Sequence, residues 1–261
     1  MNQLDTVLCH FYNEEYLLPW WLNHHKKLFK NGIMVDYNST DNSRKIIEEI
    51  CPHWKIVNSR NEEFSTSHID HEIMDLERSL PENTWRICLN VTEFLILNQD
   101  LHTELKLKSE VRIQTVSMVD DVVNSNKFPT YDKPLIDQCY YGFINGESNL
   151  DREFELMTCR NYMYRSLHNY NIHYPNGRHF KDKENITENA WILWYGFSPF
   201  NNELLKRRLQ IQNRIPQIDK DRNFGWQHIT TKEMLENALQ KNQPYVKNFK
   251  DFIGKYYNFI E

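Results

Sequence analysis

The fold is decided by residues 6–43, TVLCHFYNEEYLLPWWLNHHKKLFKNGIMVDYNSTDNS, where two apolar runs enclose an amphipathic segment. The first run, residues 6–12, predicts a buried strand. Apolar residues then recur at helical spacing over 17–29, and the Asn-Gly pair at 31–32 is expected to end that helix. The second run, residues 33–37, predicts another strand, and the turn after it is rich in helix-capping residues. The order strand, helix, strand is typical of a parallel sheet.

The alternation of strands and helices continues beyond this stretch. We expect a helix that ends before Pro52, a strand at 54–57, a helix at 69–80 and a fourth strand at 85–89. The H-I-D-H group at the start of the second of these helices fits a solvated helix face better than a metal site. Together these elements predict an α/β fold with a largely parallel sheet and helices on its faces.

The second half of the chain has a different pattern. Strand-like runs at 111–119 and 156–164 are separated by polar loops, and residues 120–151 predict an insertion or an active-site lid. After these runs the pattern becomes helical again. We therefore expect one α/β domain over 1–198, with a C-terminal helical extension packed on it over 199–261.

The composition argues against several classes of protein. A formal net charge of −5 does not suit a cationic nucleic-acid clamp. No apolar run approaches the roughly 20 residues of a membrane-spanning helix, and residues 1–5 lack the features of a signal peptide. The five cysteines are widely spaced and form no C-x-x-C pair. We therefore expect free thiols, a reducing cytoplasmic setting, no nucleic-acid partner and no transmembrane segment.

Three polar clusters directly follow predicted strands, at residues 12–15, 36–43 and 90–93. Because the carboxyl ends of neighbouring parallel strands meet at one edge of a sheet, we expect these clusters to form one ligand site. Such a site offers the carboxylate of Asp36 for a ribose or base, and hydroxyls, amides and a helix N-terminus near a phosphate. Helix capping explains any single cluster equally well, but it explains all three together less well.

Two of these clusters also carry a family resemblance. YNEEYLLPWWLNHH at 12–25, followed at the matching distance by VDYNSTDNS at 35–43, resembles the family 2-like glycosyltransferases. The resemblance implies the GT-A fold, with a mixed, mainly parallel sheet flanked by helices. It also implies a nucleotide-sugar donor and the transfer of a sugar, with inversion, to a hydroxyl of a glycan or another acceptor. The residues that it assigns to the nucleotide-sugar are Tyr12, Asn13, Glu14, Asp36, Ser39 and Asp41.

The third motif of that family, W-x-x-x-L-D-x-D-E-F, is represented here by WRICLNVTEF at 85–94. Asn90 and Thr92 replace the two aspartates that in the family hold a divalent cation against the donor diphosphate, and only Glu93 keeps a carboxylate. Neutral amide and hydroxyl groups ligate hard cations more weakly than carboxylates do. We therefore expect Mn²⁺ or Mg²⁺ to bind weakly or not at all. Cationic side chains that could replace the metal, which the pattern does not rank, are Arg60, Arg160, Arg165, Arg178 and Lys181.

The remaining candidates are a histidine and two carboxylates. NIHYP at 171–175 resembles the family's H-[FY]-P stretch, so His173 is the candidate to complete a metal site, although a lone histidine beside aromatic residues more often packs than ligates. An inverting enzyme also needs a carboxylate that deprotonates the acceptor hydroxyl. We name Asp120 and Asp121, which follow a predicted strand. The neutral residues at 90 and 92 leave a second function open, a non-catalytic GT-A-fold module that binds nucleotide, glycan or a protein partner.

Overall fold

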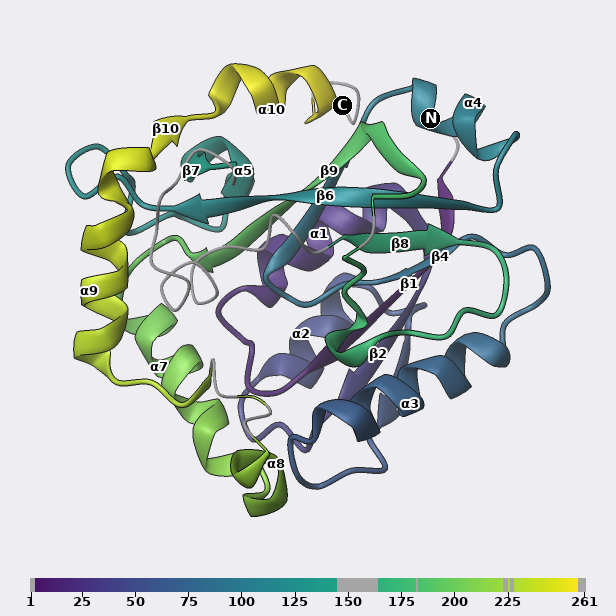
Figure 1. Cartoon of the computed structure of the whole chain (residues 1–261), viewed down its shortest axis with the longest axis horizontal. Helices are drawn as coiled ribbons and strands as arrows, with labels where there is room; N and C mark the ends of the chain where they lie inside the picture. The colour runs from purple at the N-terminus through teal and green to yellow at the C-terminus, as the bar shows by residue number, and fades with distance from the viewer. Residues whose placement is uncertain (1–2, 145–163, 182, 223–224, 226–227, 258–261) are drawn as a thin grey trace.

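The computed structural model describes residues 3–144, 164–181, 183–222, 225 and 228–257. Within them, ten strands form one mixed sheet with helices packed around it (Figure 1). The predicted α/β class, a mixed sheet flanked by helices, is confirmed. The strands are β1 (Leu4–Phe11), β2 (Phe29–Asp36), β3 (Lys55–Asn58), β4 (Arg86–Cys88), β5 (Glu93–Leu97), β6 (Glu110–Val119), β7 (Tyr141–Phe143), β8 (Arg165–His168), β9 (Ile186–Phe197) and β10 (Lys247–Asn248).

The helices occupy the outside of the molecule. Figure 1 shows α7, α8 and α9 along one side and α10 beyond them, with α3 on the opposite side. The described α-helices are α1 (Leu18–Leu28), α2 (Ser43–Ile50), α3 (Thr66–Arg78), α4 (Asp100–Leu105), α5 (Leu135–Gln138), α7 (Asn202–Gln210), α8 (Gln217–Asp221), α9 (Lys232–Asn242) and α10 (Lys250–Tyr257). Short 3₁₀ turns are η1 (Asn176–Arg178), η2 (Ile211–Arg214) and η4 (Gln243–Tyr245).

The first half of the chain forms the parallel part of the sheet, as the strand–helix alternation predicts. β1 pairs in parallel with β2 and β4, and β2 pairs in parallel with β3. Phe11 lies opposite Asp36 in the register of β1 and β2. The loops that follow these two strands therefore begin at the same level of the sheet.

The second half of the chain adds mainly antiparallel strands. β6, which matches the predicted strand at 111–119, pairs antiparallel with β7 and β8 and in parallel with β9. β9 also pairs antiparallel with β5. The predicted strand at 156–164 lies almost entirely outside the described residues. The segment predicted as an insertion contributes α5 and β7 in its described part, residues 120–144.

The end of α1 differs from its prediction. The helix stops at Leu28 and β2 begins at Phe29, so the predicted helix end at Asn31 and Gly32 is wrong. A Cβ atom on Gly32 would lie 2.2 Å from the indole of Trp54. This glycine is therefore required by the packing of a ring against β2, and it lies within the strand.

The apolar face of α1 is buried as its spacing predicts. Leu18, Trp21 and Leu22 are 0% exposed and pack in the main core cluster beneath the sheet. The helix also buries two histidines: His24 Nε2 bonds to Leu95 O at 2.6 Å, and His25 Nε2 accepts the N–H of the same residue at 3.2 Å. Both rings fasten α1 to β5, because each bonds to the backbone of that strand.

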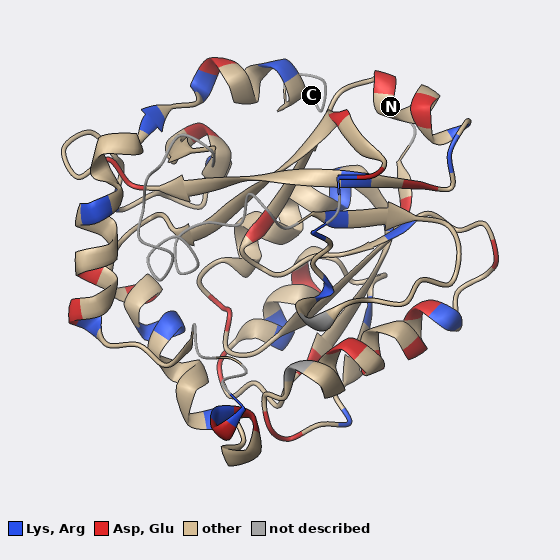
Figure 2. Cartoon of the chain, viewed as in Figure 1, with Lys and Arg blue, Asp and Glu red and all other residues tan. Residues whose placement is uncertain are grey.

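The C-terminal helices pack against one end of the sheet. Buried leucines of α7 and α9 form an apolar cluster with Val119, Phe143 and Phe197, which lie on or at the ends of β6, β7 and β9. β10 pairs antiparallel with β7, so the last part of the described chain also joins the sheet. Lys and Arg residues are interspersed with Asp and Glu over the outer helices (Figure 2). None of the helices in the described residues has the length and apolar character needed to cross a membrane.

Candidate functional site

The loops after β1 and β2 are bound to each other by hydrogen bonds between side chains and backbone. The N–H of Asn13 donates to Ser39 Oγ at 3.1 Å, and the N–H of Glu15 donates to Asp41 Oδ2 at 3.0 Å. In return, Asn13 Oδ1 accepts the N–H of Thr40 at 2.7 Å. The structure thus brings two of the three predicted clusters together, and it uses Asn13, Ser39 and Asp41 to hold their loops in place.

Asp36, predicted to contact the base or ribose, ends β2 with its carboxylate almost fully buried at 3% exposure. Its Oδ1 accepts the N–H of Ser39 at 2.9 Å, and its Oδ2 accepts from Arg44 Nη1 at 2.8 Å. The side chain of Arg44 is 41% exposed. The carboxylate therefore has one backbone partner inside the loop and one cationic partner at the surface that a ligand could replace.

Tyr12 lies beneath η2 and the last residue of α7. The guanidinium carbon of Arg214 lies 4.0 Å from the centroid of the Tyr12 ring. Arg214 Nη1 donates to Tyr37 O at 2.7 Å, and Gln210 Nε2 donates to Tyr12 O at 3.2 Å. The C-terminal part of the chain therefore covers the ends of β1 and β2.

Glu14 is the least solvated carboxylate of the first cluster. Burial, with a smaller effect from Asp41, raises its pKa to about 7, although Arg207 opposes the shift. Arg207 Nη1 lies 3.7 Å from Glu14 Oε1, and Glu14 Oε2 has no hydrogen-bond partner. Glu14 is therefore a group whose charge changes near neutral pH.

The third cluster follows β4 and is held by a buried ion pair. Glu93 is 2% exposed and accepts two bonds from the Arg165 guanidinium, Nε to Oε2 at 3.0 Å and Nη2 to Oε1 at 2.8 Å. It also accepts the N–H of Asn90 at 2.8 Å. Thr92 is buried, and its carbonyl accepts the N–H of Tyr195. Both oxygens of the one carboxylate left in this motif are thus already bonded.

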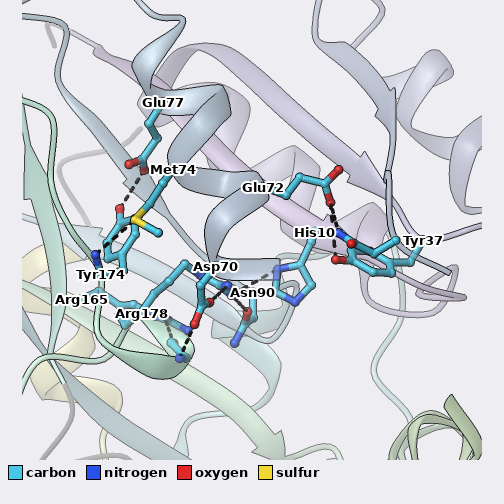
Figure 3. A network of polar contacts seen from close by, with 12 residues as sticks. His10, Tyr37, Asp70, Glu72, Met74, Glu77, Asn90, Arg165, Tyr174 and Arg178 are labelled. Atoms are coloured by element: carbon cyan, nitrogen blue, oxygen red, sulfur yellow. Dashed lines mark hydrogen bonds and ion pairs between the residues drawn. The ribbon is translucent and has the colours of Figure 1, made fainter. Parts of the chain in front are cut away.

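A second arginine lies at Asn90 (Figure 3). Arg178 is 4% exposed, and its Nη1 lies 2.5 Å from Asp70 Oδ1 on α3. Its Nη2 lies 3.2 Å from His10 Nδ1 on β1 and 3.4 Å from Asn90 Oδ1. This guanidinium joins the end of β4 to β1, so the third predicted cluster meets the other two at one edge of the sheet.

The backbone at Arg178 is strained and is clamped by two charged side chains. Gly177 and Arg178 both have left-handed conformations, with φ of 76° and 58°. Asp70 Oδ2 accepts the N–H of Gly177 at 2.7 Å, and Arg165 Nη1 donates to the carbonyls of Gly177 and Arg178 at 2.9 and 3.0 Å. A left-handed residue other than glycine costs roughly 1–2 kcal/mol, which these bonds offset.

The sequence pattern did not indicate which carboxylates of α3 face the sheet and are buried. Asp70 is 4% exposed, so the interpretation of the H-I-D-H group as a solvated face is wrong for this residue, although it holds for the exposed His68 and His71. Glu72 and Glu77 are buried as well, bonded to Ser59 Oγ and to the hydroxyl of Tyr174, both at 2.7 Å. Asp70 lies three residues before Ile73 and four before Met74, both buried, and that helical spacing was the available signal.

The residues at this edge do not fit a divalent cation. The amide oxygen of Asn90 faces a guanidinium, and both oxygens of Glu93 accept from Arg165. His173 is exposed and lies in the loop before η1. Within the part of the chain that the structure describes, no three His, Cys, Asp or Glu side chains gather as a metal site would require. Cationic side chains lie beside residues 90 and 93, where the family resemblance leads us to expect a metal ion.

The two predicted bases lie at the end of β6 in different environments. Asp120 is 0% exposed, and its Oδ2 accepts the N–H of Phe200 at 2.8 Å. Burial raises its pKa to about 6. Asp121 Oδ1 accepts the N–H groups of Val123 and Asn124 at 2.8 Å, and these bonds lower its pKa. The role of either residue as a base stays a prediction.

A hollow of about 470 Å³ lies at the opposite edge of the sheet. Asp5, Asn31, Lys55 and Thr84 line it, and they lie at or before the amino ends of β1, β2, β3 and β4. None of the three predicted clusters reaches this edge, because all of them follow the carboxyl ends of their strands.

Comparisons with known proteins give weak likenesses. No family model and no curated protein matches the chain. It is similar to S. aureus TarS 1-349 in complex with UDP, with 16% identity over 49% of this chain and 38% of that chain and a TM-score of 0.35. It is also similar to S. aureus TarS, with 15% identity over 84% and 42% of the two chains and a TM-score of 0.41. The chain thus spans less than half the length of either of these structures. It is similar as well to HddC from Yersinia pseudotuberculosis, with 11% identity over 74% of this chain and 77% of that chain and a TM-score of 0.32.

Proposed function

We propose that this chain is a glycosyltransferase that moves a sugar from a nucleotide-sugar donor to a hydroxyl group of a glycan or another acceptor. The observation that carries the proposal is the meeting of three polar motifs, residues 12–15, 36–43 and 90–93, at the carboxyl ends of β1, β2 and β4. Open α/β sheets bind their ligands at that edge. The same motifs carry the resemblance to family 2-like glycosyltransferases.

In this proposal the donor lies along the edge, with its base and ribose at Tyr12 and Asp36 and its diphosphate toward Asn90. Tyr12 offers an aromatic face once the Arg214 guanidinium that covers it is displaced, and Asp36 offers a carboxylate that can accept from ribose hydroxyls. The donor takes the place of Arg44 on Asp36, which costs little because that arginine is partly exposed. Glycan hydroxyls would then approach from the side of β6.

In an inverting transfer, the acceptor hydroxyl attacks the sugar carbon, a carboxylate takes the hydroxyl proton, and the nucleoside diphosphate leaves. Asp120 suits the base better than Asp121, because a pKa near neutrality favours proton transfer and that of Asp121 is lowered by two backbone N–H groups. Asp120 is fully buried. The Phe200 backbone must therefore move before an acceptor can reach it.

Titration calorimetry with uridine and guanosine diphosphate sugars tests the proposal. We expect at least one donor to bind, and Asp36→Asn to weaken that binding by about tenfold, since a charge-assisted hydrogen bond is lost. Asp251→Asn on α10, an exposed carboxylate of the same type, is the matched control and leaves binding unchanged. Failure of every donor to bind, or unchanged binding in Asp36→Asn, contradicts the proposal.

A non-catalytic module that binds the same ligands is the second candidate. The observation that favours it is the state of the third motif, in which Asn90 and Thr92 are neutral and Glu93 is fully bonded to Arg165. Incubation of a bound donor with glycan acceptors separates the two functions. Release of nucleoside diphosphate supports the enzyme, whereas tight donor binding with no turnover for any acceptor supports the module.

A further inference from the structure

The position that a cation would occupy beside residue 90 is already taken by a cationic side chain. Arg178 Nη2 lies 3.4 Å from Asn90 Oδ1, while Arg165 bonds to both oxygens of Glu93. We propose that the Arg178 guanidinium, set beside Asn90 by Asp70 and Arg165, binds the donor diphosphate in place of a divalent cation. This inference rests on the proposed function, and it makes donor binding independent of metal.

The guanidinium of Arg178 retains capacity for a ligand. An arginine has five N–H donors, and its planar fork matches phosphate oxygens. The Nε of Arg178 is buried and has no hydrogen-bond partner. The contact between Nη2 and Asn90, at 3.4 Å, is longer than an ordinary N–H···O bond. A phosphate oxygen can therefore replace the contact to Asn90 at Nη2 without breaking the ion pair to Asp70.

The approach to this guanidinium is from the strand ends. Asn90 and His10 are both partly exposed, whereas Arg178 itself is 4% exposed. Both of these residues contact Nη2. The Nη2 side of the guanidinium therefore faces the edge of the sheet where the three polar clusters meet, and a diphosphate that lies along this edge reaches it first.

The backbone at this position is held in a conformation that arginine seldom adopts. Arg178 has a φ of 58°, a conformation that glycine or asparagine adopts more easily. Two charged residues hold it, Asp70 through the N–H of Gly177 and Arg165 through two carbonyls. Residues in such conformations persist where the surrounding structure fixes them, and they cluster at functional sites.

The charges around the site suit a ligand that arrives without a metal. Arg178 is paired with Asp70, and Arg165 is paired with Glu93. His10 contacts the same guanidinium, and burial together with Arg178 and Arg165 lowers its pKa, so its ring is neutral. A divalent cation would find the oxygens of both carboxylates already bonded, whereas a diphosphate anion can accept from Nη2 of Arg178, whose contact to Asn90 is long.

Calorimetric titration of the full chain with UDP and GDP, in EDTA and in Mn²⁺, tests the inference. We expect the affinity of the nucleotide that binds to agree within about twofold between the two buffers. Arg178→Gln should weaken it by about tenfold or more in both, since charge-assisted bonds to phosphate are lost. The corresponding nucleoside, uridine or guanosine, lacks phosphate and should bind the variant as it binds the native protein.

Two further variants keep the test decisive. Arg178→Gln leaves Asp70 buried without its partner, so the double variant Asp70→Asn/Arg178→Gln removes both charges and keeps a polar side chain at each position. If it keeps the melting temperature of the native protein and still loses the nucleotide, the loss is not caused by unfolding. Arg78→Gln, an exposed arginine at the end of α3, is the control and should bind normally.

The outcomes separate this inference from the proposed function. Nucleotide binding that requires Mn²⁺, or unchanged binding in the folded double variant, overturns the role of Arg178 and leaves the glycosyltransferase proposal standing. Absence of nucleotide binding by the native protein in both buffers overturns both. Metal-independent binding that depends on Arg178 supports the inference.

Discussion

Two regions of the site are built by different means. The loops after β1 and β2 are joined by hydrogen bonds among residues 13–43, most of them between a side chain and a backbone N–H. The end of β4 is held by ion pairs whose partners, Asp70, Arg165 and Arg178, come from distant parts of the chain. The first region is assembled from local polar groups, and the second depends on the complete fold.

This difference predicts that the second region is the more costly to break. Arg165→Met removes the partner of Glu93 and the clamp on Gly177 and Arg178, and it leaves a buried carboxylate uncompensated. We expect a loss of about 3–5 kcal/mol in the free energy of unfolding, measured by urea denaturation. Lys232→Met, which breaks an exposed pair with Glu236, should cost no more than about 0.5 kcal/mol. A loss below about 1 kcal/mol in the arginine variant would show that the two regions do not differ.

The pH dependence of stability tests the first region through Glu14. Its folded pKa of about 7 lies above the ordinary value of 4.5 for a glutamate, so the native state retains the proton more strongly than the unfolded chain does. Its contribution to stability is therefore present below about pH 4.5 and is lost as the pH rises through 7, by about 3 kcal/mol. Glu14→Gln should flatten the dependence of unfolding free energy on pH between 5 and 8. If the unfolding free energies of the native protein and of Glu14→Gln depend on pH in the same way, the raised pKa of Glu14 is contradicted.

Trp21 connects the end of β4 to α1, because its indole N–H donates to the carbonyls of Asn90 and Glu93 at 3.1 and 2.9 Å. Trp21→Phe keeps an aromatic ring but leaves both carbonyls without this donor. We expect a loss of about 1–3 kcal/mol in unfolding free energy. Trp54→Phe is the comparison, since the indole N–H of Trp54 has no partner and its removal breaks no hydrogen bond. Equal losses in both variants would assign the effect to ring size alone.

The smallest effect is expected within the first region. Ser43 Oγ accepts the N–H of Glu14 at 2.9 Å, and Ser43→Ala leaves that donor unpaired. Unfolding should become easier by about 1 kcal/mol. Ser109→Ala, an exposed serine just before β6, should change stability by less than about 0.5 kcal/mol. A loss in Ser43→Ala that matches the effect of Arg165→Met would remove the contrast between the regions.

The sequence could predict those parts whose causes are local. β1, α1 and β2 follow from periodicity within residues 6–36, and the convergence of the loops follows from parallel pairing. The end of α1 was misplaced because the reason for Gly32 is the ring of Trp54, which is distant in sequence. β9 was not predicted, although it is the longest strand described.

The candidate site likewise contains residues whose partners are close in sequence and residues whose partners are distant. Asn13, Ser39 and Asp41 were assigned to the nucleotide-sugar because they lie in the motifs that carry the resemblance, and that role stays a prediction. Their observed partners, which hold the two loops together, lie within the same motifs. Arg165 and Arg178 were two of several unranked cations, and only the fold selects them. Glu93 selects Arg165, and Asp70 selects Arg178. The burial of Asp70 follows from how α3 sits on the sheet, and no pattern within one segment encodes that placement.

Because Arg214 stacks on the Tyr12 ring, it competes with any planar base for the face of that ring. A planar base that is to lie on this ring has to displace a guanidinium that also bonds to the carbonyls of Tyr37 and Glu62. The apparent affinity for such a ligand equals its intrinsic affinity multiplied by the fraction of molecules in which the ring is uncovered. In the proposed complex, occupancy of the ring by a base is thus linked to displacement of the Arg214 guanidinium from it.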